Sequence, residues 1–285
     1  MTIDRFKCNP IISVGMHPSL GDSINGPSLI RVPAWLPSPL GRYYLYFAHH
    51  QGTFIRLAYA DRLEGPWSIH VPGTLKLEGS HCIKHIASPD VHVDDERREI
   101  RMYYHGPVDA EGQRSKVALS TDGIIFHARP ESFGPPYFRV FCWKGIFYAL
   151  AMPGIFLRSK DGLSNFERGP QLFTPDQRHT AVRLDGNELS VFYSNAFDCP
   201  ERILLARIEL SDDWMNWKAS EPETVLQPEF NYEGSQCPLE PSKRGIICVP
   251  VHQLRDPCIY RDDAATYLLY SVAGEHGIAI ARLSA

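Results

Sequence analysis

The chain has 285 residues, of which 44% are hydrophobic and 22% are charged, and its formal net charge is −4. This composition provides enough apolar residues for a buried core in one large or two small domains. Lys and Arg are scattered without a basic stripe, which argues against a nucleic-acid partner. The segment from Met1 to Cys8 is polar, and no run approaches the roughly 20 apolar residues that span a bilayer. We therefore expect neither a signal peptide nor a membrane partner.

The seven cysteines are odd in number, far apart in the sequence and free of any C-x-x-C pair. This pattern argues against a disulfide framework and against a structural zinc site. It is typical of reduced thiols, which we expect to be mostly buried, and it predicts a cytoplasmic location.

In chain order, one unit recurs five times. A polar residue, often next to a proline, leads into a short apolar strand, and a second strand rich in aromatic residues follows. Recurrence of this kind indicates an architecture built from similar small sheets. The first and second strands are predicted at 25–30 and 43–47, 88–93 and 100–104, 136–141 and 147–150, 178–182 and 189–193, and 253–260 and 266–271. Third strands are predicted at 53–60, 115–120, 155–159, 202–208 and 277–282.

The spacing of apolar residues predicts an all-β chain. Few windows show helical spacing, whereas alternation and short apolar runs dominate, separated by most of the 23 prolines and 21 glycines. Five units of three or four antiparallel strands favour a five-bladed β-propeller that forms a single domain over residues 1–285. The blades are expected at roughly 20–75, 84–130, 134–170, 176–220 and 252–285, with a long loop at 221–251.

The propeller geometry predicts where a site would lie. The first strand of every blade lines the central channel, and its start lies on the same face as the end of its antiparallel neighbour. Polar side chains from these positions and from the long loop should therefore surround one funnel, which is a default ligand site. The candidates for acid–base catalysis are Asp90, Asp256, Glu240 and His179. The candidates for substrate binding are Asn25, His49, His50, His105, Arg139, Arg178, Glu233 and Arg255.

Each of these residues also has a structural interpretation. Asp90 and Asp256 adjoin prolines at the starts of strands, where a carboxylate can accept backbone N–H bonds and fix a turn. Arg255 points to the other side of its strand from Asp256, so a structural salt bridge is favoured for it. Strand-end histidines are often satisfied structural groups, and a lone loop glutamate such as Glu240 is often solvated surface. Both interpretations stay open at this point.

The repeats resemble the five-bladed propellers of glycoside hydrolase families 43, 32, 62, 68 and 117, the arabinanase, β-xylosidase and invertase type. The resemblance covers nearly the whole chain and includes Ser-x-Asp-Gly turns at Ser120 and Ser159. It is carried further by Asn25-Gly26-Pro27-Ser28, Ala87-Ser88-Pro89-Asp90-Val91 and Arg255-Asp256-Pro257. It implies two acid–base carboxylates acting on a glycosidic bond.

The sequence departs from the carboxylate pattern that this resemblance implies. The base expected in the first strand of the first unit falls at Gly26, with Asn25 before it. The carboxylate expected at the start of the third unit falls in 136–139, which contains none. Asp90 matches the aspartate that the resemblance implies in the first strand of the second unit. One of the implied carboxylates is therefore present in this sequence.

The general acid that the resemblance implies is a glutamate near the fourth unit. Glu201 is local to that unit, whereas Glu233 and Glu240 come later in the chain. Some proteins with a similar fold use a histidine as the acid, which brings in His179 or His105.

We therefore expect an atypical glycosidase that acts on a small sugar or glycoside in the central funnel by carboxylate and histidine chemistry. One alternative is a propeller that binds sugar without hydrolysing it, because the first unit lacks its carboxylate. A second alternative is a metal-assisted enzyme that uses His49, His105, His179 and aspartates. No cofactor is expected to be required, although Ca²⁺ near the channel axis would suit oxygen ligands. The expected partner is a small-molecule carbohydrate.

Overall fold

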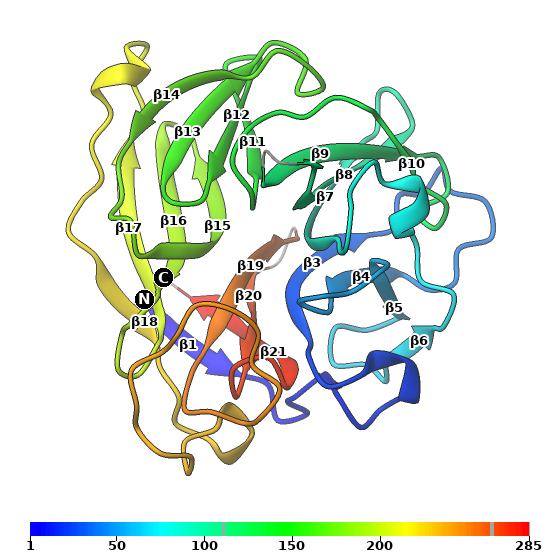
Figure 1. Cartoon of the computed structure of the whole chain (residues 1–285), viewed down its shortest axis with the longest axis vertical. Helices are drawn as coiled ribbons and strands as arrows, with labels where there is room; N and C mark the ends of the chain where they lie inside the picture. The colour runs from blue at the N-terminus through cyan, green and yellow to red at the C-terminus, as the bar shows by residue number, and fades with distance from the viewer. Residues whose placement is uncertain (110–111, 263–264, 285) are drawn as a thin grey trace.

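The structure is a computed structural model that describes residues 1–109, 112–262 and 265–284. Five antiparallel sheets stand around a central axis, and in four of them the strand that comes first in the sequence is innermost (Figure 1). This arrangement confirms the predicted all-β, five-bladed propeller. Across the described ranges, no helix is both long enough and apolar enough to cross a membrane.

The first four blades each contain four consecutive strands. From the axis outward, blade 1 contains β3 (Asn25–Arg31), β4 (Tyr43–Ala48), β5 (Arg56–Ala60) and β6 (Ser68–His70). Blade 2 contains β7 (Ala87–Asp94), β8 (Glu99–Pro107), β9 (Gln113–Ser120) and β10 (His127–Ala128). Blade 3 contains β11 (Arg139–Trp143), β12 (Ile146–Ala151), β13 (Ile155–Ser159) and β14 (Glu167–Gln171). Blade 4 contains β15 (Gln177–Asp185), β16 (Glu188–Asn195), β17 (Ile203–Glu209) and β18 (Glu223–Leu226).

Blade 5 joins the two ends of the chain. It contains β19 (Arg255–Arg261), β20 (Thr266–Val272), β21 (Gly277–Ser284) and, as its outer strand, the N-terminal β1 (Thr2–Arg5). The short β2 (Ile12–Ser13) also pairs with β21. The N-terminal strand β1 is not among the strands predicted from the sequence, and β18 lies inside the predicted loop at 221–251. The pairing of β1 with β21 closes the ring, as Figure 1 shows.

The aromatic second strands fill the spaces between blades, as their repetition suggested. Tyr46 of blade 1 donates a hydrogen bond to the carbonyl of Gly123 in blade 2 (2.8 Å). Tyr103 of blade 2 donates in the same way to Gly162 of blade 3 (2.9 Å). Both acceptors lie in Ser-x-Asp-Gly turns, in which the serine and aspartate side chains bind the turn's own backbone. The repeated motif therefore couples blade 1 to blade 2 and blade 2 to blade 3.

The cysteines differ from expectation in burial. All seven are free thiols, but only Cys258 is buried, and Cys8, Cys142, Cys199 and Cys248 are exposed. The prediction of mostly buried cysteines is therefore wrong. The cytoplasmic location stays a prediction.

Ring closure uses Glu233, which the sequence analysis assigned to substrate binding. This side chain is fully buried, and its carboxylate accepts hydrogen bonds from Arg5 Nε and from Tyr270 Oη, both at 2.8 Å. The backbone N–H groups of Glu229 and Phe230 also donate to it. The oxygens of Glu233 thus fasten the N-terminal strand to blade 5 and the long loop, and its assignment to substrate binding has no contact among the described residues to support it.

We predict that Glu233→Gln lowers the free energy of unfolding by about 3 kcal/mol, because it leaves the Arg5 guanidinium without its buried partner. Chemical denaturation followed by circular dichroism measures this loss. Glu229→Gln is the matched control, because Glu229 also pairs with Arg5 but is largely exposed, so its loss should stay within about 0.5 kcal/mol. Equal effects of the two substitutions would contradict the role given to Glu233.

Candidate active site

One backbone feature recurs at the channel mouth in all five blades. Each inner strand begins with a residue in the left-handed region, with φ between 47° and 69°. In four blades this residue lies within a shift of the strand register, and in blade 3 it lies just before β11. For residues other than glycine this conformation is costly, and such strain is concentrated at functional sites. The five residues are Gly26, Ser88, Tyr137, His179 and Asp256.

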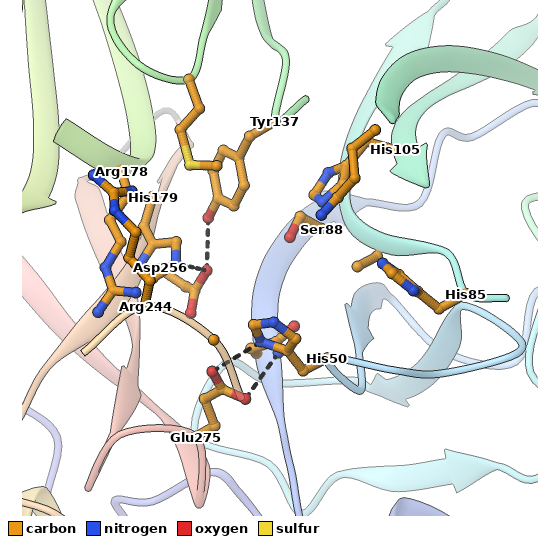
Figure 2. A pocket seen from close by; sticks show the side chains of 15 residues that line it. His50, His85, Ser88, His105, Tyr137, Arg178, His179, Arg244, Asp256 and Glu275 are labelled. Carbon is orange, nitrogen blue, oxygen red and sulfur yellow. Dashed lines mark hydrogen bonds and ion pairs between the residues drawn. The ribbon is translucent and has the colours of Figure 1, made fainter. Parts of the chain in front are cut away.

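These positions converge on a cavity of about 240 Å³ at one end of the channel. Four of the five left-handed residues line it, and blade 1 contributes Asn25 instead of Gly26. Figure 2 shows side chains from separate blades facing one another across this space. Of the predicted residues, the cavity wall includes Asn25, His50, His105, Arg178, His179 and Asp256.

Asp256 is the carboxyl group best placed for chemistry. Only 2% of the residue is exposed, and its Oδ1 accepts a hydrogen bond from Tyr137 Oη (2.8 Å; Figure 2). Its Oδ2 is buried without a hydrogen-bond partner among the described residues. Burial, together with the negative charge of Glu275, raises the pKa of Asp256 to about 6, against the opposing effects of Tyr137 and Arg255. This carboxyl group can therefore hold or release a proton near neutral pH.

Tyr137, which donates to that carboxyl group, is packed between three other side chains. Its ring lies over the Arg139 guanidinium at 4.1 Å and between the rings of His105 and His179, with centroid distances of 5.9 and 5.6 Å. Arg139 is buried and donates to the carbonyls of Ser88 and Phe138. Arg139 therefore does not line the cavity, and its predicted role in substrate binding is replaced by support of Tyr137.

His50 and Glu275 form a second polar pair in the cavity. His50 Nδ1 donates to Glu275 Oε1 (3.1 Å), and the side chain of His50 is about one-third exposed. Burial would raise the pKa of Glu275, but the hydrogen bond and charge of His50 and the charge of Arg255 outweigh it and lower that pKa. Ser23 and Asn25 donate to the other carboxylate oxygen. Glu275 therefore remains ionised and orients the imidazole.

A buried ionic network supports the wall that carries His179. Arg255 is completely buried and lies between the carboxylates of Glu201 (3.2 Å) and Glu275 (3.1 Å). Arg178 pairs with Glu201 from the cavity side. The structural salt bridge favoured for Arg255 is thus observed, and its substrate-binding role is not. Glu201 has no exposed surface and is occupied by these two arginines and by Ser194, so it is not a free acid.

Two histidines of the cavity wall, His105 and His179, are kept neutral. Burial lowers the pKa of His105 to about 3, and burial with the charges of Arg178 and Arg255 lowers the pKa of His179 far below its ordinary value. His179 Nε2 lies 3.9 Å from Asp256 Oδ1, and its Nδ1 lies 3.3 Å from Ser194 Oγ. Neutral imidazoles both donate and accept hydrogen bonds, which suits hydroxyl groups.

Two of the predicted catalytic residues lie elsewhere. Asp90 is further along the channel, where its Oδ2 accepts from the Val140 N–H and from His92 Nε2, each at 2.8 Å. Asp90 thus accepts a backbone N–H bond, as its structural interpretation predicts, but the donor lies in β11 of blade 3 and not in the turn of Asp90 itself. Glu240 is exposed on the long loop and outside the cavity wall. His49, predicted to bind substrate, instead pairs with Asp22 (2.9 Å).

Six polar or charged residues of the wall are absent from the candidates predicted from the sequence. They are His85, Ser88, Gln113, Tyr137, Arg244 and Glu275. Ser88 has a sequence signal that it shares with the predicted residue Asp256. Each of the two directly precedes a proline at the start of an inner strand. Glu275 lies in the turn after β20, where the sequence shows no such signal.

Gly26 occupies the blade-1 position where the resemblance implies the base. A Cβ atom there would lie 2.8 Å from the Cα of Ser88, and φ is +58°. Any side chain at this position requires the backbone of blade 2 to move. The absence of a carboxylate in blade 1 is therefore built into the packing of the two inner strands.

Metal binding receives no geometric support in the parts of the chain that the structure describes. There, no group of three or more His, Cys, Asp or Glu side chains is arranged to hold an ion. Ca²⁺ near the axis stays a prediction.

Solved structures that are similar to this chain include glycoside hydrolases. A family 43 β-xylosidase/α-arabinofuranosidase from a compost microbial metagenome has a TM-score of 0.64 at 13% identity, over 99% of this chain and 96% of its own. A GH43_1 enzyme from Xanthomonas citri has a TM-score of 0.63 at 12% identity, over 92% and 88% of the two chains. An α-L-arabinofuranosidase from Lactobacillus brevis has a TM-score of 0.60 at 12% identity, over 97% and 92%. The chain thus has the five-bladed propeller fold of glycoside hydrolase family 43 enzymes.

At the level of sequence, no family model matches. Uncharacterized protein R118 of Acanthamoeba polyphaga mimivirus is 36% identical to this chain, over 98% of this chain and 89% of that protein. The chain belongs to the same family as protein R118.

We predict that Gly26→Ala destabilises the fold by about 1–3 kcal/mol, because alanine is strained at positive φ and its Cβ meets the backbone of Ser88. Thermal unfolding measures the effect. Gly15→Ala is the control, since a Cβ at that position has no neighbour within 4 Å. A Gly26→Ala protein as stable as Gly15→Ala would show that blade 1 can accept a side chain there.

Proposed function

We propose that the protein is a glycoside hydrolase that holds one sugar unit in the cavity and uses Asp256 as its general acid. The observation that carries this proposal is the Oδ2 atom of Asp256, a buried carboxyl oxygen without a protein partner in the cavity wall. The fold shared with family 43 enzymes supports it, although a fold alone does not define an activity.

In this proposal, Asp256 donates its proton to the glycosidic oxygen. Tyr137 engages Oδ1, so the transferable proton resides on Oδ2. A pKa of about 6 keeps a useful fraction of the group protonated in weakly acidic solution. Hydrophobic burial and a nearby second carboxylate raise the pKa of general acids in glycosidases in the same way.

His50 takes the place of the missing blade-1 base. Glu275 holds Nδ1 as the protonated nitrogen, which leaves Nε2 as a base without another partner among the described residues. Nε2 accepts a proton from water as the water oxygen bonds to the anomeric carbon. The bond from that carbon to the glycosidic oxygen breaks, and the leaving group takes the proton of Asp256. A base orients its water more reliably when a carboxylate fixes the imidazole tautomer.

The remaining wall suits a single sugar. A volume of about 240 Å³ lies below the usual range of ligand pockets, so one ring fits more readily than a chain. Asn25 Oδ1 and His105 Nδ1 are further buried atoms without a hydrogen-bond partner in the described residues. Hydroxyl groups would satisfy both atoms. The names of the structural neighbours refer to xylose and arabinose units, which makes pentosides the first compounds to test.

A second candidate function is sugar binding without hydrolysis. Gly26 favours it, because the blade-1 position of the base is closed to any side chain. Calorimetric titration with xylose, arabinose and their glycosides, combined with product analysis, separates the two functions. Binding without product at any pH from 4 to 8 would favour the binding protein.

We predict that Asp256→Asn lowers kcat by about 10²- to 10⁴-fold on any glycoside that the protein hydrolyses, because the acid is lost while the shape is kept. Release of 4-nitrophenol from 4-nitrophenyl β-xyloside and α-L-arabinofuranoside provides the assay. Glu240→Gln is the control and should leave kcat within twofold, because Glu240 lies outside the cavity wall. Loss of activity in Glu240→Gln with full activity in Asp256→Asn would reverse the assignment.

The pH dependence follows from the pKa of Asp256. A general acid must be protonated, so kcat/KM should fall as pH rises through about 6. The hydroxyl of Tyr137 stabilises the ionised carboxylate, so Tyr137→Phe should raise the pKa of Asp256. The basic limb of the pH profile, where kcat/KM falls, should then move about one pH unit higher. Tyr103→Phe removes a comparable buried hydrogen bond outside the cavity and should leave the limb in place. An unmoved limb in Tyr137→Phe would mean that another group controls it.

A further inference from the structure

We propose that Phe197 and Arg244 form a second subsite, beside the mouth of the cavity, that stacks against a ring on the leaving-group side of the substrate. This inference rests on the proposed function, because it concerns the part of a glycoside that extends out of the cavity. The ligand class is a glycoside whose leaving group presents a flat face, namely a second sugar ring or an aryl ring.

Phe197 is an exposed aromatic residue in a strained conformation. Its φ is +73° and 56% of its surface is accessible to solvent. A bulky residue in the left-handed region costs free energy, and an exposed ring recovers none of it by burial. Its N–H donates to Ser242 Oγ (2.9 Å), which anchors the backbone of Phe197 to the long loop.

The chain topology places this ring next to the cavity. β16 ends at Asn195, and its neighbour Ser194 pairs with the cavity residue Arg178. Phe197 follows two residues later, at the channel-mouth end of blade 4. The guanidinium of Arg244, which lines the cavity, lies over the Phe197 ring at 5.6 Å. One face of the aromatic group therefore adjoins a residue of the cavity wall.

The long loop is anchored so that Arg244 stays there. Arg244 donates to the Pro175 carbonyl (2.7 Å) and to Asp176 (3.2 Å), and Arg178 donates to the Lys243 carbonyl (3.2 Å). The N–H of Ser242 donates to the carbonyl of Asp198. These contacts hold two segments together, 197–198 and 242–244, and the two segments form the wall of the subsite.

The chemistry of the pair selects a ring face rather than an anion. Asp176 balances the charge of Arg244, so the guanidinium offers a planar surface more than a free positive charge. Phenyl and guanidinium planes both stack on apolar faces, which sugar rings and aryl groups present. A methyl leaving group has no such face and should gain nothing from this subsite.

Calorimetry on the Asp256→Asn protein tests the subsite without interference from turnover. The probes are methyl and 4-nitrophenyl β-xyloside and the corresponding α-L-arabinofuranosides. For the sugar that binds, we expect the nitrophenyl glycoside to bind about threefold to tenfold more tightly than the methyl glycoside. Adding Phe197→Ala should reduce this advantage to less than twofold, and Phe197→Tyr should retain it.

Phe230→Ala is the matched control. Phe230 is similarly exposed, at 48%, and also lies under an arginine, but that arginine is Arg5 at the ring closure. The nitrophenyl advantage should survive this substitution. The subsite is overturned if the Asp256→Asn protein binds the nitrophenyl glycoside no more tightly than the methyl glycoside, or if Phe197→Ala leaves the difference in affinity unchanged. Either result holds whether or not the unmodified protein hydrolyses glycosides. A Phe197-dependent advantage in a protein that yields no product overturns the proposed hydrolysis and leaves the subsite standing.

Discussion

The cavity depends on one backbone constraint, the left-handed residue at the start of each inner strand. A regular strand would alternate its side chains between the two faces of the sheet, so few of them would point along the channel axis. The left-handed turn instead directs a side chain of Ser88, Tyr137, His179 or Asp256 into the common space. The strain of four such residues is sustained by the sheets on either side, which are fixed by pairing and by the aromatic contacts between blades.

Buried charge is the second constraint, because it sets the protonation of the site. Arg255 lies between the carboxylates of Glu201 and Glu275, and these carboxylates in turn order Arg178 and His50. The negative charge of Glu275 also helps to keep a proton on Asp256. Arg255, which is buried behind the cavity wall, thus helps to determine that Asp256 and not Glu275 is the carboxyl group that holds a proton. The two carboxyl groups of the cavity have separated pKa values for this reason, which is the arrangement that acid–base chemistry requires.

The fold could be predicted from the sequence because its signals are local and repeated. Aromatic second strands and Ser-x-Asp-Gly turns recur, and each has a direct physical function between blades. The site was predictable only where the residue type and the strand end coincide, as for Asp256, His179 and His50. Asp90 and Glu233 have the same residue types at plausible positions, but their carboxylates bind backbone and arginine groups that sequence spacing does not reveal.

The two wall residues Tyr137 and Glu275 show why the remainder could not be predicted. Tyr137 resembles the many core tyrosines, and only the left-handed backbone distinguishes its direction. Glu275 belongs to a turn, and its role depends on Arg255 and His50, which come from a different strand and a different blade. Long-range contacts of this kind are fixed by ring closure and not by any local pattern.

The position of β1 in blade 5 has a consequence for biosynthesis. Its partner strand β21 ends at Ser284, so β1 cannot pair until all the blades that follow it in the chain have been synthesised. Contacts between segments so distant in sequence form slowly. Until then, the outer edge of β21 is an unpaired strand edge of the kind that leads to association between chains. A nascent molecule is therefore exposed to aggregation at this strand edge until β1 completes the ring.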